Sequence, residues 1–148
     1  MSIDNKQIIG WREWVLLPDL GLPKIKAKID TGARTSTLHA FKVNGYVKNG
    51  AKRVRFSVHP LQKDNDTVVE CDAPVADHRF VTDSGGHKEK RYVIVTTLQI
   101  GDQSWEIEMT LTNRDTMKFR MLLGRTAMRK RLIVDPGTSY RIGKKPKK

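Results

Sequence analysis

The sequence predicts an all-β protein, a closed barrel with one short C-terminal helix. Three observations predict this class. Apolar and polar residues alternate with a period of two in several segments, glycine-rich turns separate those segments, and only one short stretch favours a helix. Many short strands joined by tight turns are typical of barrels and sandwiches, in which one face of each strand is buried.

The alternation is clearest in three segments. Ile25, Ala27 and Ile29 alternate with lysines, and residues 54–58 and 105–111 show the same pattern. Each pattern indicates a strand with one face in a core and the other in water. The full set of expected strands, in chain order, is 10–17, 25–29, 38–43, 54–58, 68–73, 79–82, 91–100, 105–111 and 120–123.

The single helix is expected at 125–131, a short basic stretch directly after Gly124. With 148 residues the whole chain, 1–148, is expected to form one domain. Its two ends, 1–6 and 143–148, are expected to be flexible. Glycine, asparagine, aspartate and proline gather in turns between the strands, at 18–21, 44–45, 48–50, 84–86 and 101–102.

Composition bounds the partners and the compartment. The formal net charge is +12, and such a field attracts acidic protein segments, nucleic acid or anionic small molecules. No apolar run is long enough for a membrane-spanning helix. A single cysteine, Cys71, and an N-terminus without the layout of a secretory signal indicate a cytoplasmic protein.

The most informative motif is Asp30-Thr31-Gly32, where an alternating strand delivers a carboxylate into a tight turn. Two carboxylates held close together share one proton, so one acts as a base toward water and the other donates a hydrogen bond. This chain has one such motif, so a second Asp30 must come from another copy in a two-fold homodimer. The alternative interpretation is that Asp30 is an ordinary turn residue at a strand end.

A second element strengthens the first interpretation. Ninety residues later the apolar run at 121–123 ends in Gly124-Arg125. Together the two elements resemble retroviral-type aspartic proteases, in which a hydrophobic pair and a glycine lie under the active-site loop. The resemblance implies that Leu123 and Gly124 support the loop, that Asp30 carries the acid/base role, and that Thr31 and Gly32 hold it.

A closer resemblance involves three segments, 9–15, 26–36 and 122–128. They are similar to the family named "putative ATP-dependent zinc protease", now regarded as retropepsin-like aspartic endopeptidases. That family is associated with glutamate ligases that add glutamates to a ribosomal protein. Its older name finds no support here, because the chain has neither a Gly-x-x-x-x-Gly-Lys-Ser/Thr loop nor a His-Glu-x-x-His motif. No cofactor is expected.

One position departs from the retroviral pattern. Arg34 stands where those enzymes have an aspartate that pairs with the arginine after the C-terminal glycine, here Arg125. Two cations cannot form that pair, but they could hold a substrate carboxylate between them. We therefore expect Ala33, Arg34 and Arg125 to contact substrate, and acidic peptides to be preferred. For the two arginines, bracing of the active-site loop is the alternative role. The alternative is that Arg34 faces solvent or pairs with another acid such as Asp135.

A flexible flap over the substrate is expected within 75–90, with Ser84, Gly85 and Gly86 at its tip. A plain solvent-exposed hairpin is an equal alternative for this tip, and the segment 44–66 competes for the flap role. Metal binding is not expected, because ligand spacing is absent among His39, His59, His78, His87 and Cys71.

These observations together predict a homodimeric aspartic-type endopeptidase that hydrolyses peptide bonds, including glutamate-rich ones, with an Asp-activated water. The substrate implied by the resemblance is an acidic peptide or protein such as a glutamate-modified ribosomal protein. The alternative hypothesis is a non-catalytic binding module of the same fold for an acidic protein partner or ribosomal RNA. Nucleic acid is the less favoured partner, and no membrane is expected.

Overall fold

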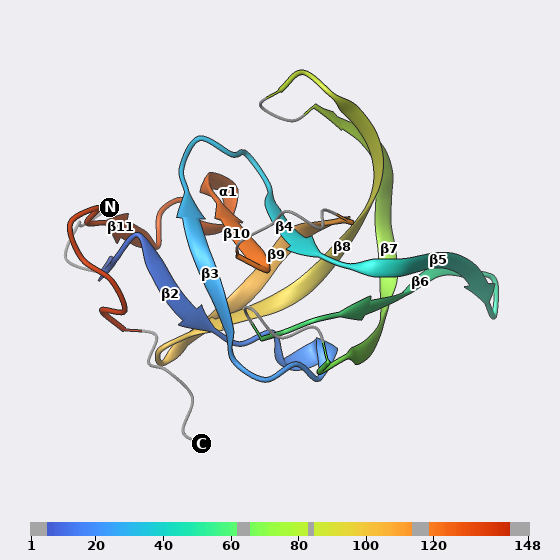
Figure 1. Ribbon diagram of the computed structural model, residues 1–148, viewed down its shortest axis with the longest axis horizontal. Coiled ribbons are helices and arrows are strands. Elements are labelled where there is room, and N and C mark those ends of the chain that lie inside the picture. The colour runs from blue at the N-terminus through green and yellow to red at the C-terminus, as the bar shows by residue number, and fades with distance from the viewer. Residues whose placement is uncertain (1–5, 62–65, 83–84, 114–118, 143–148) are drawn as a thin grey trace.

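A computed structural model describes residues 6–61, 66–82, 85–113 and 119–142. The ends expected to be flexible therefore lie outside the described residues, apart from Lys6. The strands are β1 Gln7–Ile9, β2 Arg12–Val15, β3 Ile25–Asp30, β4 Ser36–His39, β5 Phe41–Lys48, β6 Ala51–Val58, β7 Val69–Thr82, β8 Lys88–Ile100, β9 Gln103–Thr112, β10 Met121–Gly124 and β11 Leu132–Val134. A 3₁₀ turn, η2 Pro18–Leu20, and a one-turn helix, α1 Arg125–Met128, complete the fold (Figure 1).

The strands form two sheets. Nine of them pair in the order β2-β3-β10-β4-β9-β8-β7-β6-β5, and β1 pairs in parallel with β11 in a separate two-stranded sheet. The expected closed barrel is wrong, because β2 and β5 stand at opposite edges of the large sheet and do not pair with each other. The mostly-β class with one short helix is confirmed.

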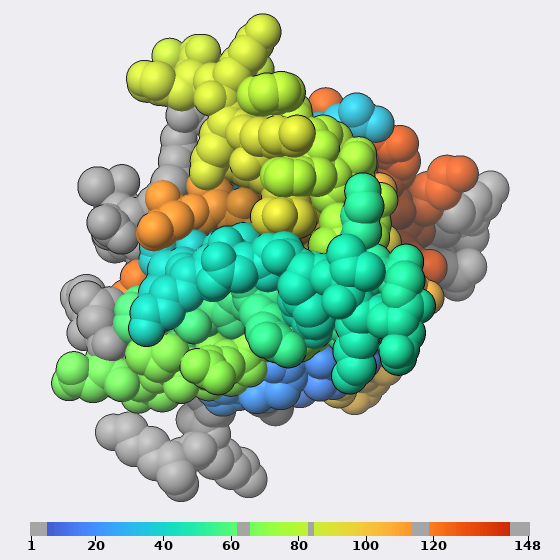
Figure 2. All heavy atoms as spheres, turned by 90° about the vertical axis from the view of Figure 1, so that its right-hand side faces the viewer, coloured from blue at the N-terminus to red at the C-terminus, as the bar shows by residue number. Residues whose placement is uncertain are grey.

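The sheet stays open because its last hairpin, β5–β6, extends away from the body (Figure 1). At the other edge the sheet curls over, since Leu16, just after β2, forms a bridge to Gln99 of β8. In the space-filling view the β5–β6 hairpin forms a continuous teal band across one face, below the yellow β7–β8 hairpin (Figure 2). This projecting hairpin is called the β5–β6 arm below.

The boundaries of strands and helix differ most from expectation in three places. The segments 68–73 and 79–82 belong to one strand, β7, which bends at a register shift between Val75 and Asp77. The expected strand 38–43 is divided between β4 and β5, and Asn44-Gly45 lies inside β5 rather than in a turn. The expected helix at 125–131 ends at Met128.

The core explains why β3 is fixed so firmly. Ile25 and Ala27 are completely buried, and Ile29 is nearly so, while the lysines between them face outward. Behind them, β10 contributes Met121 and Leu123, both fully buried. Burying an aliphatic side chain of this size stabilises the fold by about 1.5–3 kcal/mol. The strand that ends at Asp30 is therefore anchored along its length by core packing.

Candidate active site

Asp30 is the last residue of β3 and is half-buried. The backbone N–H of Gly32 donates a hydrogen bond to Asp30 Oδ1 at 3.1 Å, and the N–H of Ala33 donates to the Asp30 carbonyl at 3.2 Å. A Cβ atom at residue 32 would lie 3.3 Å from the Asp30 carboxylate. The turn thus holds the carboxylate through a close backbone donor, as expected for Gly32. Thr31 is exposed.

β10 runs parallel to β3 and brings Gly124 into register with Asp30. A Cβ atom on Gly124 would lie 2.6 Å from the carbonyl carbon of Thr35, so the backbone of the loop rests directly on this glycine. The N–H of Gly124 donates to Ser36 Oγ at 3.0 Å. Leu123 and Gly124 therefore lie behind the Asp30 loop, where the sequence predicted them.

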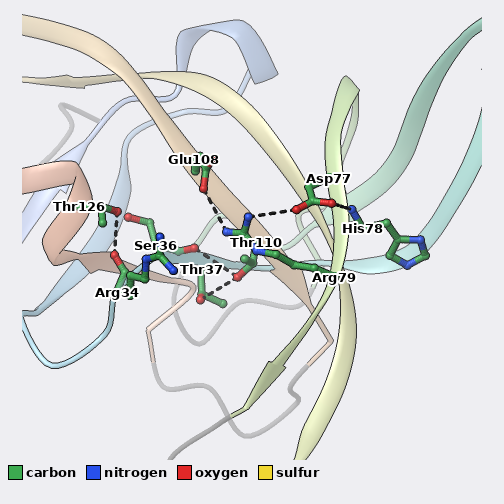
Figure 3. A network of polar contacts seen from close by, with 9 residues as sticks. All are labelled: Arg34, Ser36, Thr37, Asp77, His78, Arg79, Glu108, Thr110 and Thr126. Carbon is green, nitrogen blue, oxygen red and sulfur yellow. Dashed lines mark hydrogen bonds and ion pairs between the residues drawn. The ribbon is translucent and has the colours of Figure 1, made fainter.

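The start of α1 ties down the same loop. The N–H of Arg125 donates to the Ala33 carbonyl at 2.8 Å, and Thr126 donates to the Arg34 carbonyl from both its N–H and its hydroxyl (Figure 3). The Arg125 guanidinium donates to the Gly32 carbonyl at 3.1 Å. Arg125 consequently braces the loop.

Arg34 behaves differently from Arg125. Its side chain is exposed and lines a cleft of about 650 Å³ together with Asp30. The suggested pairing with Asp135 is not seen, since Asp135 lies 3.9 Å from Arg141 instead. Among the described residues no carboxylate pairs with Arg34, so its charge is available to a ligand in the cleft.

The opposite wall of the cleft is the β7–β8 hairpin, which arches over the Asp30 loop (Figure 1). Phe80 presents an apolar ring there, with 68% of the residue exposed. Arg79 donates to Asp77 and to Glu108, each at 3.1 Å, which ties β7 to β9 across β8 (Figure 3). The Glu108 carboxylate, and then that of Asp77, raises the pKa of Arg79.

The cleft floor is polar. Thr37 and Thr110 are buried, and their hydroxyls lie 3.0 Å apart. Arg91 is buried beside them on β8, with its Nε 3.0 Å from Glu89. The cleft is therefore lined by one carboxylate at a turn, four threonines and three guanidinium groups. Arg79 and Arg91 are paired with carboxylates, so Arg34 is the guanidinium available to an anionic ligand, and Asp30 is the group available for proton exchange. The complete lining is Asp30, Gly32, Ala33, Arg34, Thr35, Thr37, Arg79, Phe80, Val81, Thr82, Arg91, Thr110 and Leu122.

The predicted flap segment 75–90 thus supplies a wall of the cleft, whereas no residue of 44–66 lines it. Gly85 and Gly86 are exposed at the hairpin tip and do not line the cleft, and Ser84 lies outside the described residues. Sequence reasoning missed the floor hydroxyls and the wall arginines. In the sequence, these residues are marked only by the face of a predicted strand on which they lie. That face does not show which strands come together in the fold.

Other reactive groups lie elsewhere. Cys71 is buried, and burial raises the pKa of its thiol to about 11, so it is a thiol rather than a nucleophilic thiolate at neutral pH. In the described part of the chain, no three histidine, cysteine, aspartate or glutamate side chains gather into a set that could hold a metal ion. Within that same part, no helix has both the length and the apolar character needed to cross a bilayer.

Comparison with known proteins adds a family and two kinds of relative. Residues 8–145 match the RimB-like family, described as retropepsin-like aspartic endopeptidase RimB. A crystal structure of a Legionella pneumophila protein of unknown function superposes with a TM-score of 0.76 at 29% identity, covering 91% of this chain and 97% of the other.

The curated relatives carry a different name. A protein of Shewanella pealeana is 47% identical over 96% of this chain, and one of Parasynechococcus marenigrum is 50% identical over 94%. Both are named probable alpha-L-glutamate ligase. The chain spans about a third of the length of these relatives, 31% and 30% respectively.

These names correct one expectation. The sequence predicted a homodimeric endopeptidase, with a non-catalytic binding module as the alternative. Relatives at this level of identity are named ligases, which form an amide bond instead of hydrolysing one. The prediction failed because it took the reaction from motif resemblances, in the Asp30 loop and in segments 9–15, 26–36 and 122–128, and such motifs do not by themselves fix the direction of the reaction.

Proposed function

The chain belongs to the RimB-like family of retropepsin-like aspartic endopeptidases, and from that membership we propose that it is an enzyme acting at α-glutamyl amide bonds of acidic peptides, in company with a glutamate ligase. One observation carries the proposal. A turn-held carboxylate, Asp30, lies at the edge of a cleft whose other charged lining residues are Arg34, Arg79 and Arg91.

Asp30 is the acid/base group of this proposal. Forming or breaking an amide bond requires a proton to move at the nitrogen or at the attacking oxygen, and a positioned carboxylate supplies that transfer. The name of the curated relatives favours formation of that bond, and the proposal places the bond beside the Asp30 carboxylate.

The other cleft groups position the substrate. Arg34 is free to form a charge-assisted pair with a glutamate side chain. The Phe80 ring covers the aliphatic part of a bound peptide and limits its contact with water. The buried Thr37 and Thr110 hydroxyls form a hydrogen bond with each other, and Thr110 donates to the Ser36 carbonyl, so this pair fixes the shape of the cleft floor.

The first test removes the carboxylate. The purified chain is incubated with an oligoglutamate peptide, with and without glutamate, ATP and a glutamate ligase, and the peptide masses are followed by mass spectrometry. We expect the peptide to change by whole glutamate residues and Asp30→Asn to slow that change by roughly 10²–10⁴-fold. Asp102→Asn, in the exposed turn after β8, is the matched control and should keep the wild-type rate.

Two outcomes would count against the proposal. In one, Asp30→Asn works as fast as wild type. In the other, wild type leaves the peptide unchanged under every combination of partners.

A second test concerns Arg34. Because Arg34 is exposed and lines the cleft together with Asp30, Arg34→Ala should lower the preference for oligoglutamate over a matched oligoglutamine peptide. We expect a fall of about threefold to tenfold in the ratio of kcat/KM values, the range of one charge-assisted pair at a partly solvated site. Arg129→Ala, an exposed arginine just after α1, is the control. An unchanged ratio in Arg34→Ala would remove this role.

A further inference from the structure

The outer face of β3 carries a row of cations that ends at the active-site turn. Lys26 and Lys28 share strand parity with Asp30 and face away from the core. On the neighbouring strand β2, Arg12 is the register partner of Lys28, and Trp14 is the register partner of Lys26. Arg12, Lys26 and Lys28 are called the cationic track below.

Two of these cations are held in place by aromatic rings. The Arg12 guanidinium lies 4.6 Å from the Trp11 ring centroid and 4.9 Å from that of Tyr140. The Lys26 ammonium lies 5.2 Å from the Trp14 ring centroid. Because the rings already order these side chains, less conformational entropy is lost when they bind an anion.

No described carboxylate neutralises the track. The one acidic residue of β2, Glu13, points into the core, where it accepts hydrogen bonds from the backbone N–H groups of Gly10, Arg141 and Ile142. None of the three track cations forms an ion pair with another described residue, and Lys28 is exposed to solvent. The face is thus a concentrated positive charge beside the cleft.

The spacing of the row fits an extended peptide. Side chains on one face of a strand recur at about 6.6 Å, and those on one side of an extended peptide recur at the same interval. A peptide lying along β3 could therefore place successive acidic side chains opposite Lys28 and Lys26 while its next residues enter the cleft at Asp30. β3 leads directly into the loop beneath the β7–β8 hairpin (Figure 1).

We propose that the cationic track is a binding site, outside the cleft, for the carboxylate-rich part of a peptide whose end lies at Asp30. This inference rests on the proposed function for the identity of the peptide, and it adds where the rest of that peptide binds. A peptide fits better than single-stranded RNA, because bases need free aromatic faces. Here Trp14 and Tyr140 stack on each other at 6.3 Å and already carry cations.

The test measures binding without turnover. Asp30→Asn protein is titrated against a fluorescein-labelled oligoglutamate peptide, and anisotropy gives Kd. Adding Lys26→Gln with Lys28→Gln should raise Kd about tenfold, since two charge pairs with the peptide are lost. The matched control adds Lys48→Gln with Lys52→Gln on the exposed β5–β6 arm, which removes the same charge and should change Kd by less than about twofold.

Equal weakening in both double variants would overturn the inference, because only net charge would then matter. A single-stranded RNA oligonucleotide that displaces the peptide and itself needs Lys26 and Lys28 would overturn it in favour of a nucleic-acid surface. The two proposals fail separately. If the Lys26→Gln, Lys28→Gln variant loses peptide binding but the wild-type protein does not change the peptide, only the proposed function is wrong. If the wild-type protein changes the peptide but binding does not depend on Lys26 and Lys28, only the proposed binding site on the track is wrong.

Discussion

Gly124 is the residue on which the shape of the Asp30 loop most directly depends. Its backbone touches that of Thr35 and Ser36 so closely that a Cβ would meet main-chain atoms at 2.6–2.9 Å. Main chain cannot rotate aside as a flexible side chain can, so the loop itself would have to move. The loop carries Asp30, and stability and activity therefore depend on the same contact.

Gly124→Ala should lower the free energy of unfolding by about 1–3 kcal/mol, the usual cost of overpacking a buried site. It should also reduce turnover of oligoglutamate, because Asp30 is displaced. Urea denaturation measures the first effect. The control is Gly137→Ala, whose Cβ would meet only the Asp135 side chain at 3.4 Å and should be nearly neutral. Equal stability of the two variants would show that the loop does not rest on Gly124.

At the scale of single residues, the sequence predicted the residues of the motif but not those that surround it. Asp30, Gly32 and Gly124 carry recognisable spacing and turn chemistry, so their placement followed from the chain alone. Glu13 gave no such signal. It lies at a core position of β2, and two of the N–H groups that its carboxylate accepts from come from the distant chain segment at 141–142, beside that of Gly10.

At the scale of elements, the β5–β6 arm depends on one carboxylate of β7. Asp72 accepts hydrogen bonds from the Tyr46 hydroxyl and from Arg53 Nε, the latter at 2.8 Å, and Arg55 Nε lies 3.5 Å away. Tyr46 belongs to β5 and the two arginines to β6, so three strands meet at this side chain. The Tyr46 hydrogen bond, followed by the arginine contacts, lowers the pKa of Asp72.

The sign of the resulting pH effect follows from that lowered pKa. A carboxyl group with a lower pKa in the folded state stabilises the fold above its unfolded value of about 3.9, and this contribution is lost as the pH falls through the folded value. Asp72→Asn should therefore lower Tm near neutral pH, and the difference from wild type should shrink below about pH 4. Asp102→Asn, in an exposed turn, is the control. A difference that stays constant down to low pH would contradict this account.

Element-scale prediction succeeded wherever the alternation was local. Residues 25–29, 54–58 and 105–111 all lie in strands, because the period-two pattern is a property of each segment. The prediction of a turn at Asn44-Gly45 was wrong because the glycine is needed for packing against another strand. A Cβ at Gly45 would lie 2.3 Å from the Tyr92 hydroxyl oxygen, so that glycine admits an aromatic side chain of β8 instead of making a turn.

At the scale of the whole molecule, closure of the sheet was the main error. Local alternation predicts strands but not whether the first and last strands of a sheet meet. Here β2 and β5 remain apart, since the β5–β6 arm departs from the body, and the short β1–β11 pair was not predicted at all. Its strands are three residues each, too short for a periodic signal.

Net charge is the property of the whole molecule that the proposals use most. With a formal charge of +12, the protein attracts any polyanion through a field that extends about 10 Å at 0.1 M salt and about 3 Å at 1 M. A field of this kind adds to the cleft arginines and the cationic track, and it weakens with salt far more than direct hydrogen bonds do.

Binding of oligoglutamate should therefore weaken at least tenfold between about 0.05 M and about 0.5 M salt, whereas binding of oligoglutamine should hardly change. Anisotropy titrations of the Asp30→Asn protein measure both series. The Lys26→Gln, Lys28→Gln variant should show a shallower salt dependence than the Lys48→Gln, Lys52→Gln variant, because the charges nearest the peptide contribute most to the field that it meets. If the two variants have the same slope, the attraction comes from the overall charge and the track has no special part in it. If oligoglutamate binding is insensitive to salt, electrostatic attraction does not govern peptide recognition by this protein.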